Sequence, residues 1–149
     1  MVAVYIFLQP NLINGKNVST ITDVNTIFSV GPYPELDKMY ALKGMDYTSI
    51  ISLLHPAVVP FEPVLLEKER KNAKEAGLEF INIPLLPWIS DNNNSIDSLR
   101  RFVRNARGKY YVHCYLGVDR IAAASRIITQ EGKITSGMNK NEKLLREKF

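Results

Sequence analysis

The chain has 149 residues, of which 46% are hydrophobic and 23% are charged, and its formal net charge at pH 7 is +4. This length and composition are typical of one soluble globular domain and exclude a disordered or fibrous chain. One cysteine excludes an internal disulfide framework, and two histidines leave no metal-ligand cluster of recognisable spacing.

The charge is compatible with a phosphate-bearing partner and does not require one. Lysines and arginines spread over helix faces and the C-terminal tail are typical of a solvated surface rather than a nucleic-acid interface. The apolar opening, residues 1–8, is too short for a membrane span and lacks the flanks of a signal peptide. We therefore expect a single domain, 1–149, that is a cytoplasmic monomer without a membrane span, nucleic-acid partner or metal.

The first third of the chain predicts two strands and a helix. Residues 2–9 are rich in β-formers and are followed by the turn residues Asn14-Gly15, and residues 26–30 read as a second strand ended by glycine and proline. A helix is expected over residues 34–44, because proline opens it, apolar residues recur at helical spacing and glycine closes it.

The middle of the chain continues the alternation. Residues 47–54 form an apolar strand, and a charged helix follows over residues 62–76. The charge run of this helix predicts a solvated face. Its buried stripe is expected to consist of Leu65, Leu66, Ala73 and Ala76. A strand over residues 80–85 then leads into a polar loop over residues 86–94.

The last third predicts one strand between helices. Ser95 is expected to cap a helix over residues 96–107, and a strand follows from residue 110. We expect an apolar helix over residues 121–130, a break at residues 132–137, and a basic amphipathic helix to the end. The alternation as a whole predicts an α/β fold with a central, mostly parallel sheet flanked by helices.

The stretch 110–121 carries the strongest chemical signal. It runs from a strand through His113-Cys114 to Arg120 at the start of an alanine-rich helical segment. A loop at a helix N-terminus directs backbone N–H groups inward, so an anion can bind there. The same dipoles and the Arg120 guanidinium favour a thiolate at Cys114, while the planar fork of Arg120 can bind two phosphoryl oxygens. Gly117 permits the turn.

The pattern His113-Cys114-x5-Arg120 resembles the signature loop of the cysteine-dependent phosphatases, the protein tyrosine and dual-specificity phosphatases. The order of strand, Gly31-Pro-Tyr-Pro34, short helix and buried strand is similar to the opening of dual-specificity domains. The resemblance implies a phosphatase-like α/β fold, attack of Cys114 on a phosphate monoester, a phosphocysteine intermediate and no cofactor. Residues expected to orient the cysteine or bind substrate are His113, Tyr115, Leu116, Gly117, Val118 and Asp119.

Ester cleavage also needs a proton donor for the leaving oxygen. In the family an aspartate on a loop upstream of the cysteine supplies it, and Asp91 is the match here. Asp97 is a poorer candidate, because in the first helical turn a carboxylate stabilises the helix dipole. Asp119 is the rival: an Asp-Arg pair resembles the loops of myotubularin and Sac phosphoinositide phosphatases, although Asp119 could instead pair with Lys109 or a helix cap.

Ile121 departs from the family pattern, which usually places Ser or Thr after the loop arginine to stabilise the leaving thiolate. A slow second step and an accumulating phosphoenzyme are therefore expected. The loop lacks the extra cations that would favour polyphosphorylated inositides, which favours a phosphoprotein or small phosphoester substrate. A phosphate-binding pseudophosphatase stays open, and a rhodanese-type sulfurtransferase fits less well, because of the five-residue spacing and His113.

Overall fold

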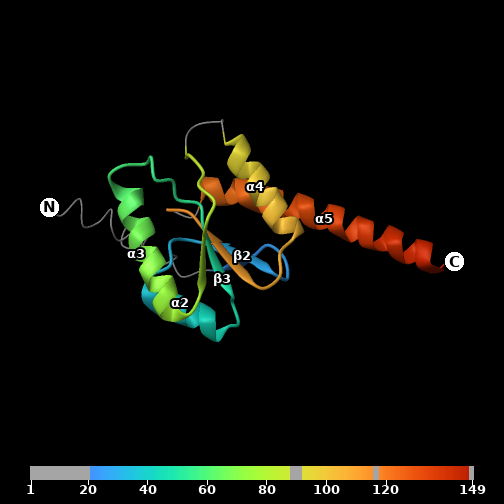
Figure 1. Cartoon of the computed structure of the whole chain (residues 1–149), viewed down its shortest axis with the longest axis horizontal. Helices are drawn as coiled ribbons and strands as arrows, with labels where there is room; N and C mark the ends of the chain where they lie inside the picture. The colour runs from blue at the N-terminus through green and yellow to red at the C-terminus, as the bar shows by residue number, and fades with distance from the viewer. Residues whose placement is uncertain (1–20, 88–91, 116–117, 148–149) are drawn as a thin grey trace.

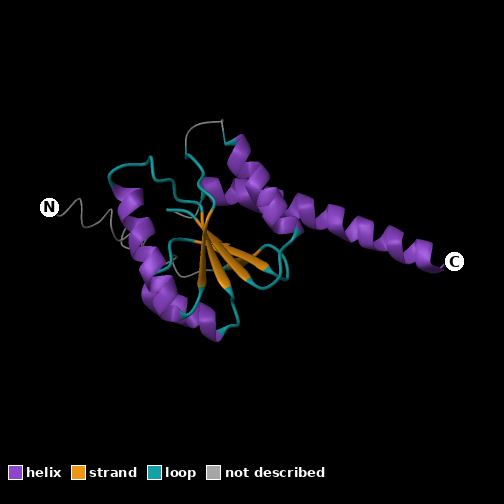
Figure 2. Cartoon of the chain, in the orientation of Figure 1, coloured by secondary structure: helices purple, strands orange, loops and turns teal. Residues whose placement is uncertain are grey.

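The computed structural model describes residues 21–87, 92–115 and 118–147, with the backbone alone at residues 135, 136 and 138–147. The predicted strand over residues 2–9 and the turn at Asn14-Gly15 lie outside the described residues. The described part is an α/β arrangement in which one sheet lies between two layers of helices (Figure 2).

The strands form a single sheet with the spatial order β1-β2-β5-β3-β4. Only β1 is antiparallel to its neighbour, and all other neighbouring pairs are parallel. The strands are β1 (Thr22–Asp23), β2 (Phe28–Gly31), β3 (Ser49–Ser52), β4 (Glu79–Asn82) and β5 (Tyr110–His113). The prediction of a central, mostly parallel sheet is confirmed, and β5, which precedes the cysteine, lies in its middle.

Four described helices flank this sheet (Figure 1). Helices α2 and α3 pack together near one face, and α4 and α5 pack together near the other. Their bounds are α2 (Leu36–Gly44), α3 (Phe61–Ala76), α4 (Asn93–Arg104) and α5 (Asp119–Glu147). The first two match the predicted helices to within two residues.

The side chains of β5 point alternately to the two faces of the sheet, and the hydrophobic core is divided between these faces. Tyr110 and Val112 face α4 and α5, where they join an apolar cluster that includes Leu99 and Ile128. Tyr111 faces the opposite way, into the cluster lined by α2 and α3. Because both faces of the strand are covered, every residue of β5 is buried, as expected for a parallel strand inside an α/β domain.

The start of α4 differs from the prediction that Ser95 caps it. The helix begins at Asn93, and Asn92 is the residue that flanks it. The Asn92 side chain makes no cap hydrogen bond; it bonds instead to both backbone groups of Leu86. These bonds fix the turn earlier than the hydrophobic pattern indicated, so Ser95 falls inside the first turn.

The predicted break at residues 132–137 is wrong, because α5 continues through Gly132 and Gly137 as one helix of 29 residues. A glycine in a helix interior costs about 1 kcal/mol but does not prevent helical geometry. The preceding turns are anchored by the buried residues Ile121, Ala124, Ile127 and Ile128. Despite this length, neither α5 nor any other described helix is apolar enough to cross a membrane.

Candidate active site

The candidate loop begins where the central strand ends. His113 and Cys114 are buried, and Cys114 is 3% exposed. Tyr115 is half-buried, whereas Val118 and Asp119 are exposed at the start of α5. Burial and the nearby Glu62 raise the pKa of Tyr115, so its phenol keeps its proton at neutral pH. Leu116 and Gly117 lie outside the described residues.

Arg120 is held in one place by three contacts. Its Nη1 donates to the carbonyl oxygens of Leu53 at 3.3 Å and Leu85 at 3.2 Å. Its Nη2 forms an ion pair with Glu62 Oε1 at 2.6 Å. Leu53 follows β3 and Leu85 follows β4, so the guanidinium links the carboxyl ends of two strands to the first turn of α3.

The donors of Arg120 are only partly used. A guanidinium carries five N–H groups, and Nη1 donates to both carbonyls. Nη2 lies 2.6 Å from Glu62 Oε1, although this oxygen has no hydrogen-bond partner among the described residues. The planar guanidinium has further N–H groups that can bind oxygens of an oxyanion.

His113 is enclosed on all sides between β5 and α3. Its Nε2 hydrogen-bonds to Glu69 Oε1, and its Nδ1 lies 3.2 Å from the carbonyl oxygen of Cys114. The Tyr33 ring packs edge-on against the imidazole at 5.5 Å between centroids, and Tyr111 stacks on it at 6.1 Å. The ring is therefore fixed in both position and plane.

Sequence reasoning missed Glu62 and Glu69, because it assigned the charges of α3 to a solvated face. That assignment is wrong for these two carboxylates, which are 2% and 0% exposed. A signal was present: the two are seven residues apart and fall on the same helical stripe as the predicted core residues. A carboxylate on a buried stripe requires a buried cationic or donor partner.

A small cavity of about 190 Å³ lies beside the arginine. It is lined by Leu86, Pro87 and Asn92 from the loop between β4 and α4, and by Asp119 and Arg120 from α5. The two hydrogen bonds between Asn92 and Leu86, at 2.9 and 3.1 Å, close the base of that loop. The described base of the loop is therefore fixed next to the arginine.

Of the three candidate acids, the structure describes two. Asp91 lies outside the described residues. Asp97 belongs to the second turn of α4 rather than the first, and its 64%-exposed side chain pairs with Arg100 at 3.6 Å. Asp119 lines the cavity, and the predicted pairing with Lys109 is wrong, because the Lys109 amine donates to the carbonyl of Met45.

His55 lies in the turn after β3, where its Nδ1 accepts a hydrogen bond from Ala57 N. Within the described ranges, no group of three or more His, Cys, Asp or Glu side chains could hold a metal ion. The candidate residues at this edge of the sheet carry a thiol, a guanidinium and carboxyl groups.

Comparisons with known proteins rest on structure alone, because no family model and no curated protein matches the sequence. A candidate phosphatase (DUF442) from Shewanella putrefaciens CN-32 is similar, with 15% identity, a TM-score of 0.65, and 83% of this chain and 76% of that chain covered. A candidate phosphatase from Neisseria meningitidis Z2491 has 14% identity and a TM-score of 0.57, with 70% and 72% covered. Tk-PTP in its active form has 13% identity and a TM-score of 0.53, with 74% and 80% covered. The fold is therefore of the protein tyrosine phosphatase-like type.

Proposed function

We propose that the chain is a cysteine-dependent phosphomonoester hydrolase of the dual-specificity or tyrosine phosphatase type. The observation that carries the proposal is the placement of Arg120, which Glu62 and two strand-end carbonyls hold beside a cavity. The same residue follows Cys114 by the spacing of a phosphate-binding loop. The fold shared with phosphatase-like proteins supports the reaction class.

In the first step the thiolate of Cys114 attacks phosphorus, the S–P bond forms and the ester P–O bond breaks. Asp91 gives its proton to the departing oxygen, which leaves as an alcohol or phenol. In the second step water attacks phosphorus, Asp91 takes a proton from it, and the S–P bond breaks to release phosphate and the thiolate. Arg120 stabilises the charge on the equatorial oxygens in both steps.

Substrate contacts are assigned to the loop between the nucleophile and the arginine. Its backbone N–H groups would surround the phosphate, and the half-buried Tyr115 would contact the group that carries it. The remaining residues of this proposed site are His113, Leu116, Gly117, Val118 and Asp119. The loop contains no Lys or Arg before Arg120, which favours a phosphoprotein or a small phosphoester.

Ile121 shapes the expected kinetics. Its side chain is buried in the apolar cluster under the sheet, where it offers no hydroxyl to the leaving thiolate. Hydrolysis of the phosphocysteine should therefore be the slow step. Rapid mixing with an aryl phosphate should give a burst of about one equivalent of phenol before the steady state; linear release from the first turnover at a high rate would contradict this.

A second candidate is a phosphoinositide phosphatase in which Asp119 supplies the proton. The observation that favours it is that Asp119 and Arg120 line the same cavity. A third candidate function is that of a phosphate-binding protein with little or no turnover. It would follow if neither Asp91 nor Asp119 protonates the leaving group.

The decisive experiment is vanadate-sensitive hydrolysis of a generic aryl phosphate. Cys114→Ser should abolish it. Asp91→Asn should lower kcat/KM about 100-fold with a poor leaving group and much less with an acidic one, because an acidic phenol needs no proton. The matched control is Asp97→Asn, an exposed carboxylate on the adjacent helix, which should stay near wild type.

The outcomes separate the candidates. If Asp119→Asn shows the leaving-group dependence and Asp91→Asn does not, Asp119 is the acid. Binding of a phosphopeptide without phosphate release indicates the pseudophosphatase. Hydrolysis that survives Cys114→Ser would overturn the proposed chemistry altogether.

A further inference from the structure

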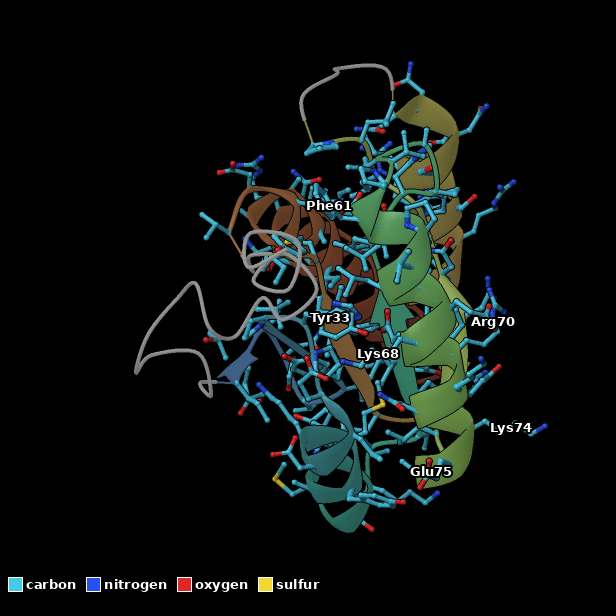
Figure 3. The ribbon with its side chains drawn as sticks, turned by 90° about the vertical axis from the view of Figure 1, so that its left-hand side faces the viewer. Tyr33, Phe61, Lys68, Arg70, Lys74 and Glu75 are labelled. Atoms are coloured by element: carbon cyan, nitrogen blue, oxygen red, sulfur yellow. The ribbon has the colours of Figure 1, made fainter. Side chains whose placement is uncertain are left out.

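Glu69 is the most deeply buried carboxylate of the described residues with a titratable partner. Glu69 and His113 are both 0% exposed, and they bond to each other across the layer between α3 and β5. Figure 3 shows Lys74 projecting from α3 away from the body of the molecule, whereas Tyr33 lies on the inner side of the helix. A charged side chain in that inner layer is costly unless its partner compensates it.

The hydrogen-bond roles of the imidazole follow from its two neighbours. The carbonyl of Cys114 can only accept, so the Nδ1 that lies 3.2 Å from it must carry a proton to bond with it. The Nε2 faces a carboxyl oxygen of Glu69. Glu69 therefore holds the second ring nitrogen, and its other carboxyl oxygen, Oε2, has no hydrogen-bond partner among the described residues.

The titratable groups packed around the ring besides Glu69 are the phenols of Tyr33 and Tyr111, together with Cys114 itself. The Lys38 amine lies 5.2 Å from the centre of the Tyr111 ring. Burial raises the pKa of both phenols, so neither is ionised at neutral pH. Their hydroxyls are engaged with the carbonyls of Leu65 and Pro32 rather than with His113. Glu69 is therefore the described carboxylate that hydrogen-bonds to this ring.

We propose that Glu69 is a positioning residue for the nucleophile: by bonding to Nε2 of His113, it holds Nδ1 against the Cys114 carbonyl and so fixes the backbone that carries the sulfur. The carbonyl is then unavailable to turn toward an incoming anion. This inference rests on the proposed function, because it assigns Glu69 a task in preparing Cys114 for attack on phosphate.

The single cysteine makes a direct measurement available, since alkylation by iodoacetamide reports on Cys114 alone. Glu69→Gln keeps the shape of the side chain and removes its charge. The alkylation rate at pH 7 should fall about 10-fold, because the ring is no longer held against the Cys114 carbonyl and the sulfur loses its fixed position. Glu67→Gln, a 63%-exposed carboxylate on the same helix, is the matched control and should leave the rate unchanged.

A double-mutant cycle separates positioning from general destabilisation. In a His113→Asn background, Glu69→Gln should cause no further loss in alkylation rate, because Glu69 acts only through the imidazole. Additive losses, or an unchanged rate in Glu69→Gln alone, would overturn the proposal. If Glu69→Gln does not fold, as judged by near-UV circular dichroism, the same cycle is run with Glu69→Asp, and the same non-additivity is expected.

Turnover provides a second readout. The burst of phenol should slow about 10-fold in Glu69→Gln at an unchanged amplitude, because the nucleophile is displaced in every active molecule. A smaller burst at an unchanged rate indicates a purely structural role and counts against the inference. Failure of the phosphatase proposal would look different: wild type would show no Cys114-dependent hydrolysis, while the alkylation cycle would still be informative.

Discussion

Two carboxylates of α3 control the two residues on which the proposed chemistry depends. Glu62 pairs with Arg120, and Glu69 pairs with His113. A buried ion pair adds little net stability, but removing one partner leaves the other charge uncompensated. The Arg120 pair is therefore a site where stability and anion binding should be coupled, because a bound anion can take over the role of the carboxylate.

We predict that Glu62→Gln lowers the free energy of unfolding by about 3 kcal/mol. The loss arises because Arg120 keeps its two carbonyl contacts and loses its counter-charge. Urea unfolding followed by circular dichroism measures it, with the exposed Glu67→Gln as a control that should stay within about 0.5 kcal/mol of wild type. Vanadate should raise the unfolding midpoint more in the variant than in wild type; an equal or smaller shift contradicts the coupling.

Lys38 is a buried amine with an unfavourable environment. Its Nζ lies 5.2 Å from the centre of the Tyr111 ring and has no hydrogen-bond partner among the described residues. Burial lowers the pKa of Lys38, and the nearby Asp37 offsets this only in part. The folded state therefore favours the neutral amine more than the unfolded state does.

We predict that Lys38→Met raises stability by about 1 kcal/mol at pH 7. The folded pKa lies below the unfolded value, so the folded state binds fewer protons at alkaline pH and wild type gains stability as pH rises. The advantage of the variant should therefore shrink between the folded pKa and the unfolded value of about 10.4. Urea titrations at several pH values check this, and the 75%-exposed Lys71→Met serves as the control. A constant advantage would show that the charge is not responsible.

At the scale of elements, most helices and strands could be predicted, because the spacing of apolar residues and the glycines and prolines at the ends of each segment indicate similar bounds. The apolar stripe of α3 and its Gly77 end are both observed, and Gly77 adopts a φ of 76°. The positions of β2, β3, β4 and β5 were predicted, although some predicted strands were too long by a few residues because apolar residues continue into the loops. The two-residue strand β1 was not predicted, because its residues are polar. The start of α4 could not be predicted, since it depends on the contact of Asn92 with Leu86, which is tertiary.

The continuity of α5 gives a test at the same scale. A Cβ at Gly132 would meet only Asn25 at 3.9 Å, so Gly132→Ala fits the space and should stabilise the protein by about 0.5–1 kcal/mol. Urea unfolding measures the gain. Gly77→Ala is the opposite control, because its left-handed φ should make alanine destabilising. A loss of stability in Gly132→Ala would indicate that the helix does break there.

At the scale of the whole molecule, the parallel sheet explains why the candidate site assembles where it does. The carboxyl ends of β3, β4 and β5 meet at one edge, and Leu53, Leu85 and Cys114 follow them directly. The sequence predicted Cys114 and Arg120 because their spacing is local. Glu62 and Glu69 could not be assigned to their partners, since pairing across 58 and 44 residues depends on how α3 packs over the sheet.

The last turns of α5 project beyond the rest of the molecule (Figure 1), and Lys133 and Ile134 are already exposed. We predict that a chain ending after residue 137 unfolds with a free energy within about 0.5 kcal/mol of the full chain and hydrolyses aryl phosphate at the same rate. Urea unfolding and steady-state kinetics check both. A much lower stability would show that residues 138–149 contact the body of the protein.

The position of β5 between two parallel neighbours has a consequence for how the molecule opens. Its amides are bonded on both sides, to β2 and to β3, and both of its faces are covered. Local fluctuations that release β1 or the far end of α5 leave these amides in place, so their protons should exchange with solvent only when the whole domain unfolds. The proposed nucleophile, Cys114, therefore directly follows the strand whose amides should exchange most slowly, and in mild denaturant its reactivity should persist until the main unfolding transition.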